Sequence, residues 1–146
     1  MSDSVNILRW IMFAQRDYNA AHNMSVLHHP VPLEIVCYHC QQSVEKILKA
    51  YILARSDPLV KTHDLESILK QCMDHDNQFA SFADICAVLT GYAIASRYPL
   101  DEDLIDEHDM ATALENTKKI LDFTRARLAE LGYSTEGTTG DSSEMQ

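Results

Sequence analysis

The stretch "LEIVCYHCQQSVEKILKAYIL", residues 33–53, decides the fold class of this 146-residue chain. Its apolar residues recur at steps of three and four, which is the repeat of one face of an α-helix. On the opposite, polar face Glu45 precedes Lys49 by four residues, the favourable order for a helical ion pair. The unbroken apolar face predicts the most buried helix of the protein, and it consists of Leu33, Val36, Cys37, Cys40, Val44, Ile47, Leu48 and Tyr51.

The segments on either side of this stretch also carry helical repeats. A first helix is predicted to end near residues 23–24, because Pro30 and Pro32 break the pattern soon afterwards. Pro32 then suits the first turn of the central helix. A short helix is predicted to follow a cap at Thr62 or Asp64.

The remaining repeats complete a helical bundle. A fourth helix is predicted from about residue 81 to Arg97, and a last helix is predicted to open at Asp106 and Asp109 and to stop at Gly132. Residues 133–146 have almost no apolar content, which predicts a disordered tail. Since no internal repeat and no convincing strand accompanies the helices, we expect an all-α fold. It is an up-and-down bundle of four long helices plus one short helix over residues 1–132.

Charge and composition exclude several functional classes. The chain carries 12 Lys and Arg residues against 22 Asp and Glu, a net charge of −10, so coating of DNA or RNA is not expected. No apolar run approaches the roughly 18 residues of a membrane-spanning helix, and the first 30 residues lack a secretory leader. The four cysteines are scattered among helical repeats rather than arranged as a disulfide framework. These features predict a cytoplasmic chain with free thiols.

Two stretches bear on metal binding. Cys37-x-x-Cys40 lies close to His39, but a zinc site would need a second ligand pair, and both cysteines fall on the apolar face. The acidic stretch "DEDLIDEHD", residues 101–109, lacks the glycine and terminal glutamate of an EF-hand and suits a helix start. We therefore expect core thiols and a solvated cap, and no resident metal. Mg²⁺ accompanying a bound nucleotide is the one exception that the pattern leaves open.

The stretch "GYAIASRYP", residues 91–99, ends a predicted helix on an arginine between two tyrosines. Arg97 at a helix C-terminus offsets the dipole. Together with Tyr92 and Tyr98 it also offers paired donors for a phosphate beside aromatic faces for a base. His63 in "KTHDLESIL" is open to two interpretations in the same way, as a residue of the helix start or as a contact for a base or phosphate.

Three of these stretches, in order, resemble the successive motifs of HEPN domains (higher eukaryotes and prokaryotes nucleotide-binding domains). "CQQSVEKILKAYIL" at 40–53 resembles the Glu-Lys-x-x-Lys-Ala helix of that family, and "THDLESIL" at 62–69 resembles its Thr-His-Asp-Leu motif. "YAIASRYP" at 92–99 resembles its Tyr-x-x-x-x-Arg-Tyr-Pro ending, and the resemblance spans about residues 5–130. The matching residues are Glu45, Lys46, Lys49, Ala50, Thr62, His63, Asp64, Leu65, Tyr92, Arg97, Tyr98 and Pro99.

The resemblance implies an up-and-down helical bundle that is usually a homodimer. The branch with the Arg-Tyr-Pro motif is often encoded beside a minimal nucleotidyltransferase, in a toxin–antitoxin-like pair, and is similar to the substrate-binding helical subunit of such enzymes. This implies a nucleotide-binding subunit with no catalytic residue of its own. Apolar residues on more than one face of the first helix, among them Trp10 and Phe13, also favour a dimer interface.

The family also contains metal-independent ribonucleases, which are marked by an arginine followed four to six residues later by a histidine. In this chain ten residues separate Arg97 from His108, and many of them are acidic. The ribonuclease alternative therefore needs Arg97 to meet His108 or His63 in space. The favoured hypothesis is instead a small pocket for a mononucleotide, with adenine as the expected base, lined by Lys46, Lys49, His63, Tyr92, Arg97 and Tyr98.

Overall fold

The computed structural model describes residues 2–97 and 105–135, and it describes side chains for residues 4–93 and 105–135. In these ranges every regular element is a helix. Five α-helices and one 3-10 helix follow each other as α1 (Ser2–Leu27), α2 (Leu33–Ala54), α3 (Leu65–Met73), η1 (Asn77–Phe82), α4 (Ala83–Arg97) and α5 (Glu107–Glu130). The predicted all-α bundle of four long helices and one short helix is confirmed.

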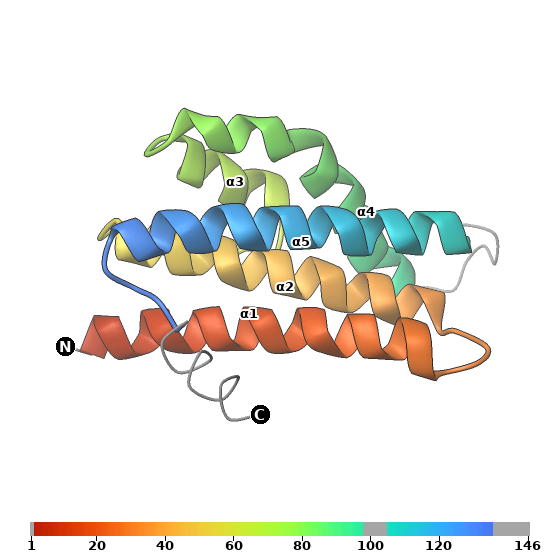
Figure 1. Cartoon of the computed structure of the whole chain (residues 1–146). Helices are drawn as coiled ribbons and strands as arrows, with labels where there is room; N and C mark the ends of the chain where they lie inside the picture. Colours follow the sequence, from red (N-terminus) through yellow and green to blue (C-terminus); the bar gives the residue numbers. More distant parts are fainter. Residues whose placement is uncertain (1, 98–104, 136–146) are drawn as a thin grey trace, which may run out of the picture.

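The four long helices alternate in direction along the chain. Figure 1 shows α1 and α2 as an antiparallel hairpin, with α5 lying beside α2 and running in the same direction as it. The shorter elements α3 and η1 cover the side of α2 and α5 that faces away from α1, and α4 returns the chain to the end where α5 begins. No helix in the described part of the chain is long and apolar enough to span a membrane.

Helix α2 is the centre of the bundle, because it packs against α1, α3, α4 and α5. Its apolar face is buried from Val36 to Tyr51, with Leu33 partly buried at the start, which confirms the prediction that residues 33–52 form the most buried helix. All four cysteines are free and buried, as predicted. An aromatic group formed by Tyr51, Phe79, Phe82 and Phe123 closes the core at the end where α2 and α5 finish.

The helix ends agree with the predicted signals in most places. Asp64 caps α3 by accepting from the Glu66 backbone N–H, and Asp106 and Asp109 form a reciprocal capping box at the start of α5. Gly132 follows α5 with φ +97, a conformation that favours glycine. Helix α1 ends at Leu27, later than predicted, because no residue before the prolines interrupts it.

The segment before α4 differs from the prediction of one helix from residue 81. The chain first forms the 3-10 helix η1, which is capped by the Asp76 side chain, and only then turns into α4 at Ala83. The C-terminal side of the bundle also continues beyond Gly132, since Tyr133 packs against the core. Residues 136–146, most of the predicted tail, lie outside the described residues.

Candidate functional site

Three polar residues of α2 are buried, although the sequence places them on the polar face of the helix. Gln41, Glu45 and Lys49 are 0%, 4% and 8% exposed, and they follow each other at steps of four residues. Lys49 Nζ lies 2.8 Å from Glu45 Oε2, and Gln41 Nε2 donates to Glu45 Oε1 over 3.1 Å. With His63, whose Nδ1 lies 2.9 Å from Glu45 Oε2, these residues form what we name the Glu45 cluster.

The Glu45 cluster is covered from two sides. Lys49 Nζ lies 5.8 Å from the centre of the Trp10 ring of α1, within range of a cation–π contact. On the other side the loop before α3 is bound to α2, because Gln41 Nε2 also donates to the His63 carbonyl over 3.3 Å. The covering loop and the Trp10 ring explain why a polar face of α2 is removed from water.

The charge state of the Glu45 cluster follows from its hydrogen bonds. Burial alone would raise the pKa of Glu45, but hydrogen bonds from Lys49 and His63 outweigh it, so the pKa lies below its ordinary value. Glu45 is therefore a carboxylate at neutral pH and can only accept. It follows that His63 Nδ1 carries the proton in this bond, which leaves Nε2 as the ring nitrogen not bonded to Glu45. The His63 side chain is 76% exposed, so this ring is open to a ligand.

A further hydrogen bond connects the loop to α4. The Leu65 backbone N–H, at the start of α3, donates to Thr90 Oγ1 over 3.2 Å. By the 3.6-residue repeat, Arg97 falls on the stripe of α4 that carries Thr90 and Ala93. The three stretches that contain Glu45, His63 and Thr90–Arg97 are thus bound to each other in the fold.

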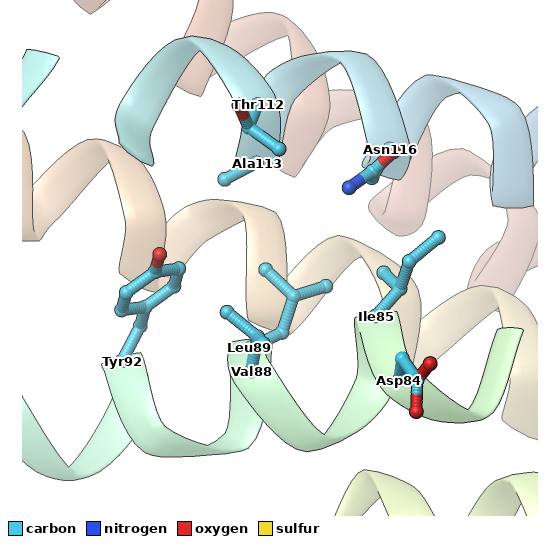
Figure 2. Close-up of a pocket in the computed structure, with 8 residues that line it drawn as sticks. All are labelled: Asp84, Ile85, Val88, Leu89, Tyr92, Thr112, Ala113 and Asn116. Carbon is cyan, nitrogen blue, oxygen red and sulfur yellow. The ribbon is translucent and has the colours of Figure 1, made fainter. Parts of the chain in front are cut away.

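Tyr92 lies elsewhere on α4, on the side that faces α5. It lines a groove of about 170 Å³ between α4 and α5, and Figure 2 shows its hydroxyl directed toward α5. Burial, followed by the nearby Asp109 carboxylate, raises the pKa of Tyr92 to about 12. The phenol therefore stays protonated and can donate a hydrogen bond. Of the predicted site residues, Tyr92 thus faces α5, whereas His63 lies in the loop before α3 and contacts Glu45 of α2.

The two predicted lysines have their charges matched inside the protein. Lys49 belongs to the Glu45 cluster, whereas Lys46 Nζ lies 2.6 Å from Asp17 Oδ2 on α1. His39 Nδ1 approaches the other oxygen of Asp17 at 3.3 Å. Of the predicted site residues, the structure brings Lys49 and His63 together and places Lys46 at a separate contact between α1 and α2.

Two predicted site residues fall at the edge of what is described. Arg97 is the last residue of α4, but its side chain and all of Tyr98 lie outside the described residues. His108 is exposed in the first turn of α5. Among the described residues, no three His, Cys, Asp or Glu side chains gather in a way that could hold a metal ion.

Sequence reasoning missed Gln41 and Thr90 as part of this arrangement. The four-residue spacing of Gln41, Glu45 and Lys49 is visible in the sequence, but the same spacing is found on solvated helices. Thr90 carried no signal, since its partner is a backbone N–H at the start of another helix.

Comparison with known proteins identifies one family. A family model described as HEPN domain matches residues 7–127, which runs from within α1 to within α5 and includes the whole Glu45 cluster. No curated protein and no solved structure matches the chain.

Proposed function

The chain belongs to the HEPN domain family, and on that premise we propose that it is a nucleotide-binding subunit. The family places it among helical modules with nucleotide- or RNA-related functions. The finer proposal is that it binds a mononucleotide and acts as the partner of a minimal nucleotidyltransferase in a toxin–antitoxin-like pair. In this proposal the chain works in the cytoplasm, where its four free thiols stay reduced.

The observation that carries the proposal is the junction of the three motif segments. Glu45 bonds to His63 over 2.9 Å, and the helix that follows His63 bonds to Thr90 over 3.2 Å. Side chains from α2, from the loop and from Thr90 of α4 therefore belong to one connected region. A ligand site built from separate segments needs such a connection to hold its groups in place.

Each predicted residue has a distinct role in the proposal. Arg97 provides paired donors for the phosphate, and Tyr92 and Tyr98 provide aromatic surface for the base. His63 faces the ligand with Nε2, while Glu45 fixes the orientation of its ring. Lys46 and Lys49 act indirectly, because their ammonium groups neutralise Asp17 and Glu45 and keep the region from being still more acidic.

Isothermal titration calorimetry with AMP and ATP tests the proposal. Replacing Arg97 by Ala should weaken binding roughly 10- to 150-fold, since a hydrogen bond to a charged group is worth about 1.5–3 kcal/mol. The melting temperature should hardly change. Arg9→Ala, which removes an exposed arginine of α1, is the matched control and should bind normally. Absence of heat with every nucleotide, together with unfolding of Arg97→Ala, would show that the arginine is a structural cap and would refute the pocket.

Self-association is the second part of the proposal, and the surface of α1 supports it. Val5, Met12 and Phe13 are 55%, 41% and 40% exposed, so one side of the helix presents apolar side chains to solvent. Such a strip is suited to a homodimer contact. Light scattering on the full chain should give the mass of a dimer at micromolar concentration, and Phe13→Glu should lower it. A monomer mass for the unmodified chain would contradict this part.

The pairing with a nucleotidyltransferase is tested by co-expression. The chain should co-purify with a minimal nucleotidyltransferase encoded beside it, and the two should elute together in size-exclusion chromatography. Separate elution of two folded proteins would count against the pairing while leaving nucleotide binding to be decided by calorimetry.

The Glu45–His63 contact also favours a second candidate function, metal-independent RNA cleavage. A carboxylate that orients an imidazole and leaves its other nitrogen exposed is an arrangement used for general acid–base catalysis. Cleavage of a single-stranded RNA in the presence of EDTA should then require His63 and Arg97. His108→Ala should keep the cleavage if His63 is the histidine that acts with Arg97, and should lose it if His108 is. No cleavage by the unmodified chain would exclude the ribonuclease function.

A further inference from the structure

The groove between α4 and α5 is a second feature of interest, because these two helices touch each other only sparsely. Its α4 side consists of Ile85, Val88, Leu89 and Tyr92, and its α5 side of Thr112, Ala113 and Asn116, with Asp84 at the rim (Figure 2). Val88 is 54% exposed, so the groove is open to solvent along its length. Its volume of about 170 Å³ is well below the roughly 300–1,000 Å³ of pockets for drug-sized ligands.

Two polar groups of the groove lack a partner in the described part of the chain. No hydrogen bond among the described residues engages the Asn116 side-chain amide or the Tyr92 hydroxyl. Figure 2 shows the Asn116 amide reaching into the space between the two helices, above Ile85 and Leu89. A half-buried amide offers one donor and one acceptor side by side. The groove thus combines apolar walls with the Tyr92 hydroxyl and with an amide that can donate and accept a hydrogen bond at the same time.

The surrounding charges determine which ligands fit. Tyr92 lies in the field of the Asp109 and Asp106 carboxylates, and Asp84 stands at the other end of the groove. These carboxylates disfavour a phosphate inside the groove. They favour an uncharged ring, above all one that carries an amino group.

We propose that the α4–α5 groove binds an adenine-type ring, with its faces against Val88 and Leu89 and its amino edge against the Asn116 amide. On the N6/N7 edge of adenine the amino donor lies next to the N7 acceptor and matches both groups of an asparagine amide, as in the pairing of asparagine with adenine in DNA recognition. The same edge of inosine offers two acceptors, O6 and N7, which one amide cannot satisfy together. The groove holds one ring system and no more, so a sugar and phosphate would extend outward. This inference rests on the proposed nucleotide binding and names the part of the ligand that Tyr92 and α5 would recognise.

The groove and Arg97 lie on different sides of α4. Arg97 is five positions after Tyr92, which is roughly 7.5 Å further along the helix axis and roughly 140° around it. One nucleotide with its ring beside Tyr92 would have to pass around the end of α4 to bring its phosphate to Arg97. The ring site itself needs no contribution from Arg97, and this allows the two to be tested apart.

The test compares adenosine with inosine, which lacks the amino group and carries a carbonyl in its place. With the ¹⁵N-labelled full chain, adenosine should shift the NMR signals of the Asn116 side-chain amide and of Val88 and Tyr92. Inosine should bind roughly 5- to 150-fold more weakly, the range expected for one two-point base contact. Asn116→Leu should erase this preference, whereas Asn23→Leu on the exposed side of α1 should keep it. Circular dichroism verifies that both variants fold.

A second variant addresses the apolar walls. Val88→Trp fills the mouth of the groove from an exposed position and should abolish adenosine binding without unfolding the chain. NMR changes confined to residues outside the groove would overturn the proposal. A preference for adenosine that survives in Asn116→Leu would overturn it as well. The same holds if the groove binds only apolar side chains of a partner protein and no adenosine.

The experiments distinguish an error in the ring site of the α4–α5 groove from an error in the proposed nucleotide binding at Arg97. Suppose that Arg97→Ala weakens AMP binding, but that Asn116→Leu keeps the preference of the unmodified chain for adenosine over inosine. Nucleotide binding then stands and the ring site is wrong. If adenosine binds in the groove and Arg97→Ala leaves AMP binding unchanged, the ring site stands and the phosphate role of Arg97 is wrong.

Discussion

Replacing Glu45 by Gln removes the carboxylate that pairs with Lys49, and the structure indicates how large the effect should be. The two groups are 2.8 Å apart, and their side chains are only 5% and 11% exposed. Breaking a buried ion pair by removing one partner typically costs about 3–5 kcal/mol, because the other charge stays buried. Gln retains hydrogen-bonding capacity, and Lys49 is not fully enclosed. We therefore expect a loss near the lower end, about 3 kcal/mol.

Urea denaturation followed by circular dichroism measures this loss as a change in the free energy of unfolding at constant m-value. The double variant Glu45→Gln with Lys49→Met should regain most of the loss, since no buried charge is then left unpaired. Glu115→Gln changes an exposed carboxylate of α5 and serves as the control, with an expected effect within about 0.5 kcal/mol.

The comparison of the two glutamates can refute the reasoning. If Glu45→Gln costs no more than Glu115→Gln, Lys49 is not held as a buried charge and the Glu45 cluster does not organise the loop. An additive loss in the double variant would lead to the same conclusion, because coupled residues must deviate from additivity.

Three further predictions concern protonation, the thiols and the loop. The folded-state pKa of Glu45 lies below the ordinary value of 4.5, so the contribution of Glu45 to the free energy of unfolding is complete above pH 4.5 and is lost as the pH falls through the folded pKa. Urea denaturation at a series of pH values from neutral to acidic should show this loss in the unmodified chain and a smaller loss in Glu45→Gln. Burial raises the pKa of the Cys37 thiol to about 12, and a thiol reagent at neutral pH should label the native chain far more slowly than the urea-unfolded chain. Thr90→Val removes the acceptor for the Leu65 N–H and should cost about 1 kcal/mol in the same denaturation assay.

Most of the fold could be predicted from local patterns. The apolar repeat of residues 33–53 determines a buried helix on its own, and Asp64 and Asp106 mark helix starts through their cap chemistry. The 3-10 helix before α4 could not be predicted in this way. Its residues carry a helical pattern, and only the packing of Phe79 against Tyr51 and Phe123 shows why the chain turns there.

The candidate site could be predicted only as a set of residues, not as an arrangement. The motifs identify Glu45, His63 and Lys49, but the sequence does not show that Trp10 and the loop cover them, since that depends on contacts between distant segments. The pairing of Lys46 with Asp17 is likewise a contact between two helices, and no spacing in the sequence indicates it.

Location of a bound nucleotide is the most direct test of the central claim, that the junction of the three motif segments forms the ligand site. A crystal structure of the chain with AMP should show the phosphate within hydrogen-bonding distance of Arg97, with the ligand at the end of α4 between the His63 loop and α5. The α2 and α5 C-termini form another hollow, which is lined by Arg55, His75 and Arg127. AMP bound in that hollow, or no bound AMP at concentrations that saturate calorimetric binding, would contradict the account.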